Sequence, residues 1–124
     1  MDTGAKRILV IDDDNNHLIA VKEILEIEGH DVYTHNKPFG STSLAKTLEP
    51  DLILLDVNMP GLSGDALSKL LCSHSKAPIV FYSSNDEDSL RQMVRSHNVR
   101  GYICKGDLYG LREKVAHYLT LSQD

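Results

Sequence analysis

Residues 51–64 (DLILLDVNMPGLSG) constrain the fold of this chain more than any other stretch. Residues 52–55 are apolar without alternation, which is typical of a strand buried on both faces in the centre of a parallel sheet. Asp56 follows at once, and the Pro60–Gly61 pair then favours a loop over a longer strand. Asp56 is therefore expected where a buried strand opens onto a loop. Open α/β sheets place their chemistry at this edge.

Four further segments are predicted as strands, and the first of them is another unalternated apolar run. They occupy residues 8–11, 31–34, 79–82 and 101–104. Helical periodicity and capping residues predict a helix after each of the five strands: over 15–28, over 38–48, from Gly64, from Asn85 or Asp86, and from Asp107. Strands that alternate with helices indicate an α/β protein with a parallel sheet, right-handed crossovers and helices on both faces.

Polar residues stand at the ends of four of the five predicted strands. They are Asp12 with Asp13, Asp56, Ser83 and Lys105. Parallel strands all end at one edge of the sheet, so these side chains are expected to converge although they lie far apart in the sequence. One such residue alone would be weak support for a site, whereas the complete set indicates a functional one.

The expected chemistry follows from the charges. Three carboxylates in one place repel each other unless a cation lies among them, and an open carboxylate site suits Mg²⁺. Mg²⁺ and Lys105 together would balance the charges of Asp12, Asp13 and Asp56. Such a site is prepared for a phosphoryl group, and an aspartate can act as the nucleophile that carries it as an aspartyl phosphate.

Composition favours one globular domain over residues 1–124. Hydrophobic residues make up 41% and charged residues 25% of the chain, which is ordinary. The net charge of −5 and the lack of a basic cluster argue against nucleic-acid binding. No stretch suits a membrane span or a signal peptide, so we expect a cytoplasmic protein. Cys72 and Cys104 lack metal-type spacing and are expected as free thiols in the interior.

Several segments together resemble the receiver domain of two-component response regulators. They are residues 8–13 (ILVIDD), 56–64 (DVNMPGLSG), 83–84 (SS) and 101–105 (GYICK). The resemblance covers essentially the whole chain. It implies a flavodoxin-like (βα)5 three-layer sandwich with strand order 2-1-3-4-5. It also implies a phosphorylatable signalling domain of a phosphorelay, which takes part in its own phosphotransfer and autodephosphorylation but is not an enzyme.

The resemblance further implies a role for each residue of the edge. Asp56 would accept phosphate from a sensor histidine kinase or a histidine phosphotransfer protein. Mg²⁺ or Mn²⁺ would be held by Asp13, Asp56 and the backbone carbonyl of Asn58, with Asp12 acting through a bound water. Ser83 and Lys105 would hold the phosphoryl oxygens. Asn58 and Asn85 flank the site and are expected to influence the lifetime of the phosphate.

The resemblance also implies a switch. Phosphorylation adds charge and three acceptors that would draw Ser83 toward Asp56, and Tyr102, the family's aromatic switch residue, would then turn inward. The readout surface would comprise the fourth helix, the fifth strand and the fifth helix. Its partner would be a downstream target protein or a fused output domain absent from this chain. No contact with nucleic acid or membrane is expected.

Other residues have simpler interpretations or depart from the family. Receivers usually carry proline after the lysine, where this chain has Gly106. We expect a trans Lys105–Gly106 bond and an altered loop, because a cis bond to glycine costs about 2.5–4 kcal/mol. Asp14 is expected as a helix cap or a solvent-facing residue and not as a metal ligand, His17 is expected on the surface, and Tyr82 is expected in the core.

Three alternatives stay open on the sequence alone. A receiver-like module that is not phosphorylated would have the same fold. A haloacid-dehalogenase-type phosphatase would use Asp12 of the run Asp12–Asp14 as its nucleophile, although such proteins need a later acidic pair and leave Asp56 without a role. A flavin-binding protein would need a donor-rich phosphate loop after the first strand, where this chain has three aspartates.

Overall fold

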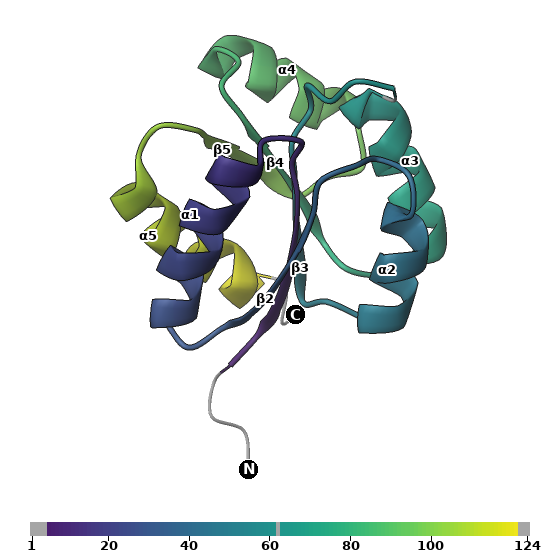
Figure 1. The fold of residues 1–124 in the computed structure, drawn as a ribbon. Coiled ribbons are helices and arrows are strands. Elements are labelled where there is room, and N and C mark those ends of the chain that lie inside the picture. The colour runs from purple at the N-terminus through teal and green to yellow at the C-terminus, as the bar shows by residue number, and fades with distance from the viewer. Residues whose placement is uncertain (1–4, 62, 122–124) are drawn as a thin grey trace.

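The computed structural model describes residues 5–61 and 63–121 of the chain (Figure 1). Strands and helices alternate along it. The strands are β1 (Arg7–Ile11), β2 (Asp31–His35), β3 (Leu52–Leu55), β4 (Ile79–Ser83) and β5 (Gly101–Cys104). The helices are α1 (Asn15–Ile27), α2 (Ser41–Leu48), α3 (Gly64–His74), α4 (Glu87–Ser96) and α5 (Leu108–Leu121).

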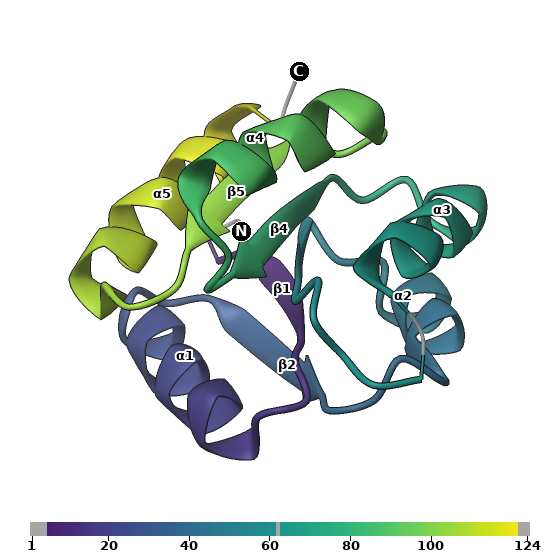
Figure 2. The ribbon, with the colours of Figure 1, turned by 90° about the horizontal axis from the view of Figure 1, so that it is seen from above.

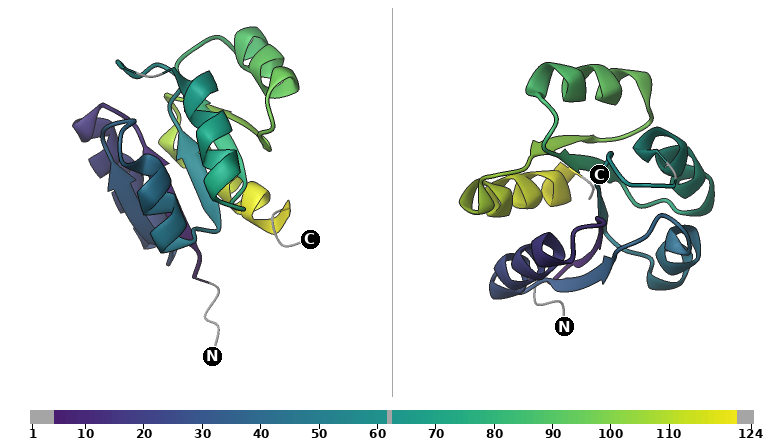
Figure 3. Two further views of the ribbon diagram at one scale, coloured as in Figure 1. Left: turned by 90° about the vertical axis from the view of Figure 1, so that its right-hand side faces the viewer. Right: turned by 45° about the horizontal axis from the view of Figure 1, so that its top comes forward.

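The strands form one parallel sheet in the order β2-β1-β3-β4-β5. Helices α1 and α5 cover one face of it, and α2 and α3 cover the other (Figures 2 and 3). Helix α4 packs beside β4 and β5. The predicted flavodoxin-like fold and its strand order are confirmed. None of the described helices has the length and apolar character needed to cross a membrane.

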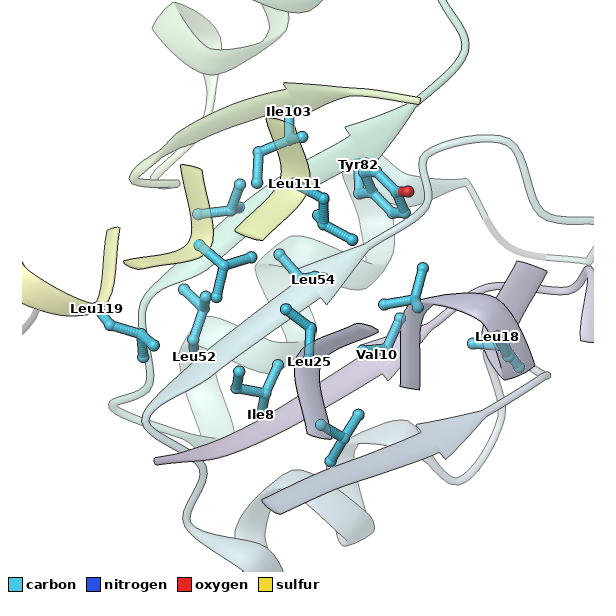
Figure 4. Packing of buried hydrophobic residues seen from close by; sticks show 14 residues of the cluster. Ile8, Val10, Leu18, Leu25, Leu52, Leu54, Tyr82, Ile103, Leu111 and Leu119 are labelled. Carbon is cyan, nitrogen blue, oxygen red and sulfur yellow. The ribbon is translucent and has the colours of Figure 1, made fainter. Parts of the chain in front are cut away.

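The central strands are buried on both faces, as their unalternated apolar runs predict. Leu52 and Leu54 of β3 belong to a cluster with α1 and α5, which Figure 4 shows. Ile53 and Leu55 point to the opposite cluster, which includes side chains of α2, α3 and α4. Side chains alternate between faces of a strand, so a strand with a core on each side needs apolar residues at every position.

Two predictions about local structure were wrong in detail. Helix α2 begins at Ser41 rather than at Pro38, because Gly40 has a φ of 86°, a left-handed conformation that cannot continue a helix. The thiols of Cys72 and Cys104 are free, as expected, but they are only partly buried. The Cys72 thiol donates to the Asn98 carbonyl at 3.3 Å.

Candidate functional site

The carboxyl ends of the strands bring the predicted site residues together. Asp12 follows β1, Asp56 follows β3, Ser83 ends β4 and Lys105 follows β5. Main-chain bonds hold these ends in register: the Asp56 N–H donates to the Ile11 carbonyl at 2.9 Å, and the Lys105 N–H donates to the Ser83 carbonyl at 2.8 Å. The site therefore lies on strand ends whose backbones are hydrogen-bonded to each other.

Lys105 lies at the centre of the charge arrangement. Its Nζ is 2.7 Å from Asp12 Oδ2 and 3.6 Å from Asp56 Oδ2. Asp12 is completely buried, Asp56 is 4% exposed, and the Lys105 side chain is 17% exposed. Charges largely removed from water interact more strongly than charges on a surface. One ammonium thus faces two buried carboxylates, and the local balance stays negative.

Asp13 completes a cluster of carboxylates that suits a divalent cation. One oxygen from each of Asp12, Asp13 and Asp56 lies within 4.8 Å of the others, and the cluster reaches solvent at the exposed Asp13. Among the described residues, Asp12 Oδ2 has the ammonium of Lys105 as its ion-pair partner but no hydrogen bond of acceptable geometry. Three carboxylates with a single ammonium among them keep a net negative charge, which fits a hard cation such as Mg²⁺.

The Asp56 carboxyl is hard to ionise in this environment. Burial raises its pKa from 3.8 to about 6, and the negative charge of Asp12 acts in the same direction. The Asn58 N–H, which donates to Asp56 Oδ1 at 3.1 Å, and the ammonium of Lys105 oppose the rise without cancelling it. A carboxyl group in this state gains from a cation that stabilises its ionised form.

Ser83 is held beside Asp56 by two asparagines. The Asn58 side-chain amide donates to Ser83 Oγ at 3.1 Å and to Asn85 Oδ1 at 2.7 Å. The Asn85 N–H also donates to Ser83 Oγ, at 3.1 Å. A serine hydroxyl has two acceptor lone pairs and one donor. The two amides occupy its acceptor capacity, so the buried hydroxyl keeps its proton for a further acceptor such as a phosphoryl oxygen.

Tyr102 extends from β5 toward the start of α4. Its ring is partly buried against the cluster that contains Phe81, its neighbour in the β4–β5 ladder. Its hydroxyl donates to Glu87 Oε2 at 3.1 Å, and its main-chain N–H donates to the Tyr118 hydroxyl at 3.2 Å. Tyr102 thus connects α4, β5 and α5 on one face of the molecule.

Sequence reasoning missed a contact between His17 and Tyr82. His17 was expected on the surface, but it is half-buried, and its Nε2 lies 2.7 Å from the Tyr82 hydroxyl. Tyr82 lies in the core as predicted, with 1% exposure. The need of a buried phenol for a hydrogen-bond partner was the available signal, but it does not identify which residue supplies the partner.

Comparison with known proteins decides the family. The profile of the response regulator receiver domain matches residues 8–116. The chain belongs to this family. It is therefore a signalling domain of two-component systems and not a classical enzyme.

Curated relatives include both short and long response regulators. The receiver is 26% identical to protein PilH of Pseudomonas aeruginosa over 102 residues, which span 80% of this chain and 84% of PilH. It is 37% identical to the cell cycle transcriptional regulator CtrA of Caulobacter vibrioides over 100 residues, 80% of this chain but 43% of CtrA. It is 35% identical to response regulator GacA of Pseudomonas viridiflava, covering 88% of this chain and 51% of GacA. The chain thus spans about half or less of the longer relatives.

Solved structures share the fold. The chemotaxis protein CheY4 of Vibrio cholerae has a TM-score of 0.82 at 22% identity, over 91% of this chain and 98% of that one. A CheY-like receiver domain from Methanospirillum hungatei has a TM-score of 0.84 at 24% identity, over 96% and 97%. Both superpose along nearly their whole length, which supports the strand order described above.

The loop after Lys105 tests the expectation drawn from Gly106. No peptide bond among the described residues is cis, so the predicted trans bond between Lys105 and Gly106 is confirmed. Gly106 has a φ of 115°, which proline cannot adopt because its ring fixes φ near −65°. The loop before α5 therefore has a backbone conformation at Gly106 that proline cannot adopt.

Two residues that flank the carboxylates have structural roles. The Asp14 side chain caps α1 by accepting from the N–H groups of Asn16 and His17, as predicted. Gly64, at the start of α3, packs so closely that a Cβ there would lie 2.5 Å from the Val57 Cα. A small residue at this position lets α3 approach the loop that follows Asp56.

Proposed function

We propose that this receiver accepts a phosphoryl group on Asp56 in a Mg²⁺-dependent reaction. The observation that carries the proposal is the contact of one ammonium, that of Lys105, with both buried carboxylates, Asp12 and Asp56. Asp56 is the nucleophile, and Lys105 neutralises charge as it accumulates on the transferred group. Lys105 Nζ lies nearer to Asp12, at 2.7 Å, than to Asp56, at 3.6 Å, so the Asp12 carboxylate is the less available of the two as a nucleophile.

The remaining residues of the edge hold the metal and the phosphoryl oxygens. Asp13, Asp56 and the backbone carbonyl of Asn58 would ligate Mg²⁺, with Asp12 acting through a water molecule. Mn²⁺ would bind to the same oxygen ligands. The available proton of the Ser83 hydroxyl supports its assignment to one phosphoryl oxygen, and the Lys105 ammonium takes another. When bound, the metal supplies positive charge at the group being transferred.

The partners follow from the family and from the site. A sensor histidine kinase or a histidine phosphotransfer protein supplies the phosphoryl group in the cytoplasm, and hydrolysis of the aspartyl phosphate resets the domain. A groove of about 320 Å³ on the face of α4, β5 and α5 supports this face as the readout surface. Its lining residues are Glu87, Tyr102, Glu113, Lys114, His117 and Tyr118. A target protein or an output domain outside this chain binds there.

Incubation with acetyl phosphate and Mg²⁺ tests the proposed site. We expect a mass increase of one phosphoryl group per chain, mapped to Asp56 and labile in base, and no such adduct with Asp56→Ala or after chelation of the metal. Asp13→Asn should retain the acceptor but require more Mg²⁺. Phosphate on Asp12 would favour the phosphatase alternative, and a chain that takes no phosphate would be an interaction module only.

Phosphorylation is also expected to move Tyr102. The phosphate draws Ser83 and the start of the loop to α4, so the contact between the Tyr102 hydroxyl and Glu87 should break as the ring turns inward. Amide spectra recorded with acetyl phosphate and Mg²⁺ should show the largest shifts at residues 83–90 and 101–105. A Glu87→Gln variant, which keeps a hydrogen-bond acceptor, serves as the control. Shifts limited to residues 56–58 would contradict the switch.

A further inference from the structure

Two aromatic side chains, Tyr82 and His17, form a pair next to Lys105 of the charged site. Tyr82 is the residue before Ser83, and its side chain belongs to the cluster with α1 and α5. Figure 4 shows its hydroxyl pointing away from Ile103 and Leu111. The hydroxyl lies 2.7 Å from Nε2 of His17 in α1, and the two ring centroids are 5.1 Å apart.

The Tyr82 ring also faces the lysine of the site. Lys105 Nζ lies 5.6 Å from the centre of this ring. The ammonium therefore has the carboxylates of Asp12 and Asp56 within 3.6 Å and the face of an aromatic ring as a third neighbour. A cation at this distance from a ring is attracted to it, and more strongly where water is largely excluded.

The position of the ring matters because a lysine side chain is flexible. Its four-carbon stem loses rotamer freedom when the ammonium is fixed, so neighbouring groups decide where the charge resides. With Tyr82 in place, the space on the α1 and α5 side of Lys105 is filled. A smaller side chain would leave a cavity there, into which the lysine could withdraw from Asp56.

The hydrogen bond to His17 fixes the ring. Burial raises the pKa of the Tyr82 hydroxyl, and burial lowers the pKa of His17, with the nearby Lys105 charge acting in the same direction. The phenol therefore stays protonated and the imidazole stays neutral near neutral pH, and such a pair forms the hydrogen bond with either group as the donor. Helix α1 begins right after the acidic loop, so this bond also connects that loop to the end of β4.

We propose that Tyr82 and His17 are positioning residues for the phosphorylation of Asp56. The Tyr82 ring holds the Lys105 ammonium toward Asp56, and His17 orients the ring. This inference rests on the proposed function, since it concerns the rate of that reaction. Neither residue touches the transferred group, and neither is a metal ligand.

Phosphorylation rates and Mg²⁺ affinity together test the inference. At saturating Mg²⁺, Tyr82→Leu should slow phosphorylation by acetyl phosphate about three- to tenfold, the range expected for loss of a partly desolvated cation–ring contact. Its Mg²⁺ dissociation constant, from calorimetry, should change less than the rate, because the metal ligands themselves are kept. Tyr82→Phe keeps the ring and should lose only about two- to threefold, and His17→Leu should match it. His17→Gln, which offers an amide near the position of Nε2, should recover the rate.

The Lys105→Met background separates positioning from a general effect on the fold. There Tyr82→Leu should have no further effect, because the group it positions is gone. An equal loss of rate with and without Lys105 would overturn the inference, as would an unchanged rate in Tyr82→Leu itself. If Tyr82→Leu does not fold, additive effects of Tyr82→Phe and His17→Leu would overturn it instead. An unaltered protein that takes no phosphate at all would fail the proposed function first, which distinguishes the two failures.

Discussion

At pH 7 without Mg²⁺, the Asp56→Asn variant should unfold about 5–10 °C above the unaltered protein, which corresponds to about 2 kcal/mol for a domain of this size. The reason is the cost of ionising Asp56 beside Asp12 in a buried site, which raises its pKa to about 6. Asparagine has nearly the same shape and carries no charge. The variant therefore removes the repulsion and keeps the packing.

The raised pKa of Asp56 determines how the stability difference between the two proteins changes with pH. Below the ordinary pKa of 3.8, the Asp56 carboxyl is protonated in the folded and the unfolded chain alike. Between that value and about 6 the folded state holds the proton more tightly, so the Asp56 contribution to stability is lost as the pH rises through this window. The difference in melting temperature between the unaltered protein and Asp56→Asn should widen across the same interval and stay constant above it.

Mg²⁺ and a matched variant supply the controls. Mg²⁺ should raise the melting temperature of the unaltered protein more than that of Asp56→Asn, because the variant has lost a ligand. Asp13→Asn, which removes an exposed carboxylate from the same cluster, should change the metal-free melting temperature by less. Melting curves from pH 4 to 8 measure all three. Equal metal-free stability of Asp56→Asn and the unaltered protein at pH 7 would contradict the prediction.

The sequence was sufficient to place Asp12, Asp56 and Lys105 at one edge. Each follows an apolar run, and the ends of parallel strands must meet, so the convergence is a consequence of topology. The trans conformation of the peptide bond between Lys105 and Gly106 was also predictable, because a cis peptide bond to a residue other than proline is costly. Both inferences need only the local sequence and the rule that parallel strands end at the same edge of their sheet.

The contact of His17 with Tyr82 could not be predicted in this way. These residues are 65 positions apart, and their meeting depends on how α1 is rotated over the sheet. The amphipathic pattern of a helix defines its buried face but not the residues at its border. The same limit applies to Tyr102, whose bond to Glu87 depends on the angle at which α4 approaches β5. The convergence of Asp12, Asp56 and Lys105 was predictable, whereas the contacts that His17 and Tyr102 make with distant side chains were not.

The second large effect is expected on replacing Lys105 with methionine, which keeps the length of the side chain and removes its charge. Asp12 is completely buried, and the lysine ammonium is its ion-pair partner among the described residues. Removing one member of a buried ion pair leaves an uncompensated charge and costs about 3–5 kcal/mol. Lys105→Met should therefore unfold far below the melting temperature of the unaltered protein when Mg²⁺ is absent. Lys69→Met, at an exposed position of α3, is the matched control and should change little.

Mg²⁺ should then separate the two roles of the lysine. A divalent cation among the carboxylates replaces the missing positive charge, and at about 100 times its dissociation constant it contributes about 2.7 kcal/mol to stability. Phosphorylation of Lys105→Met at the same Mg²⁺ concentration should stay about 10²- to 10³-fold slower, because no cation remains where the lysine meets the developing charge. Melting curves and acetyl phosphate reactions on the same samples measure both. Recovery of both together would mean that Lys105 only neutralises its acidic neighbours, whereas recovery of the fold alone assigns it a direct part in phosphoryl transfer.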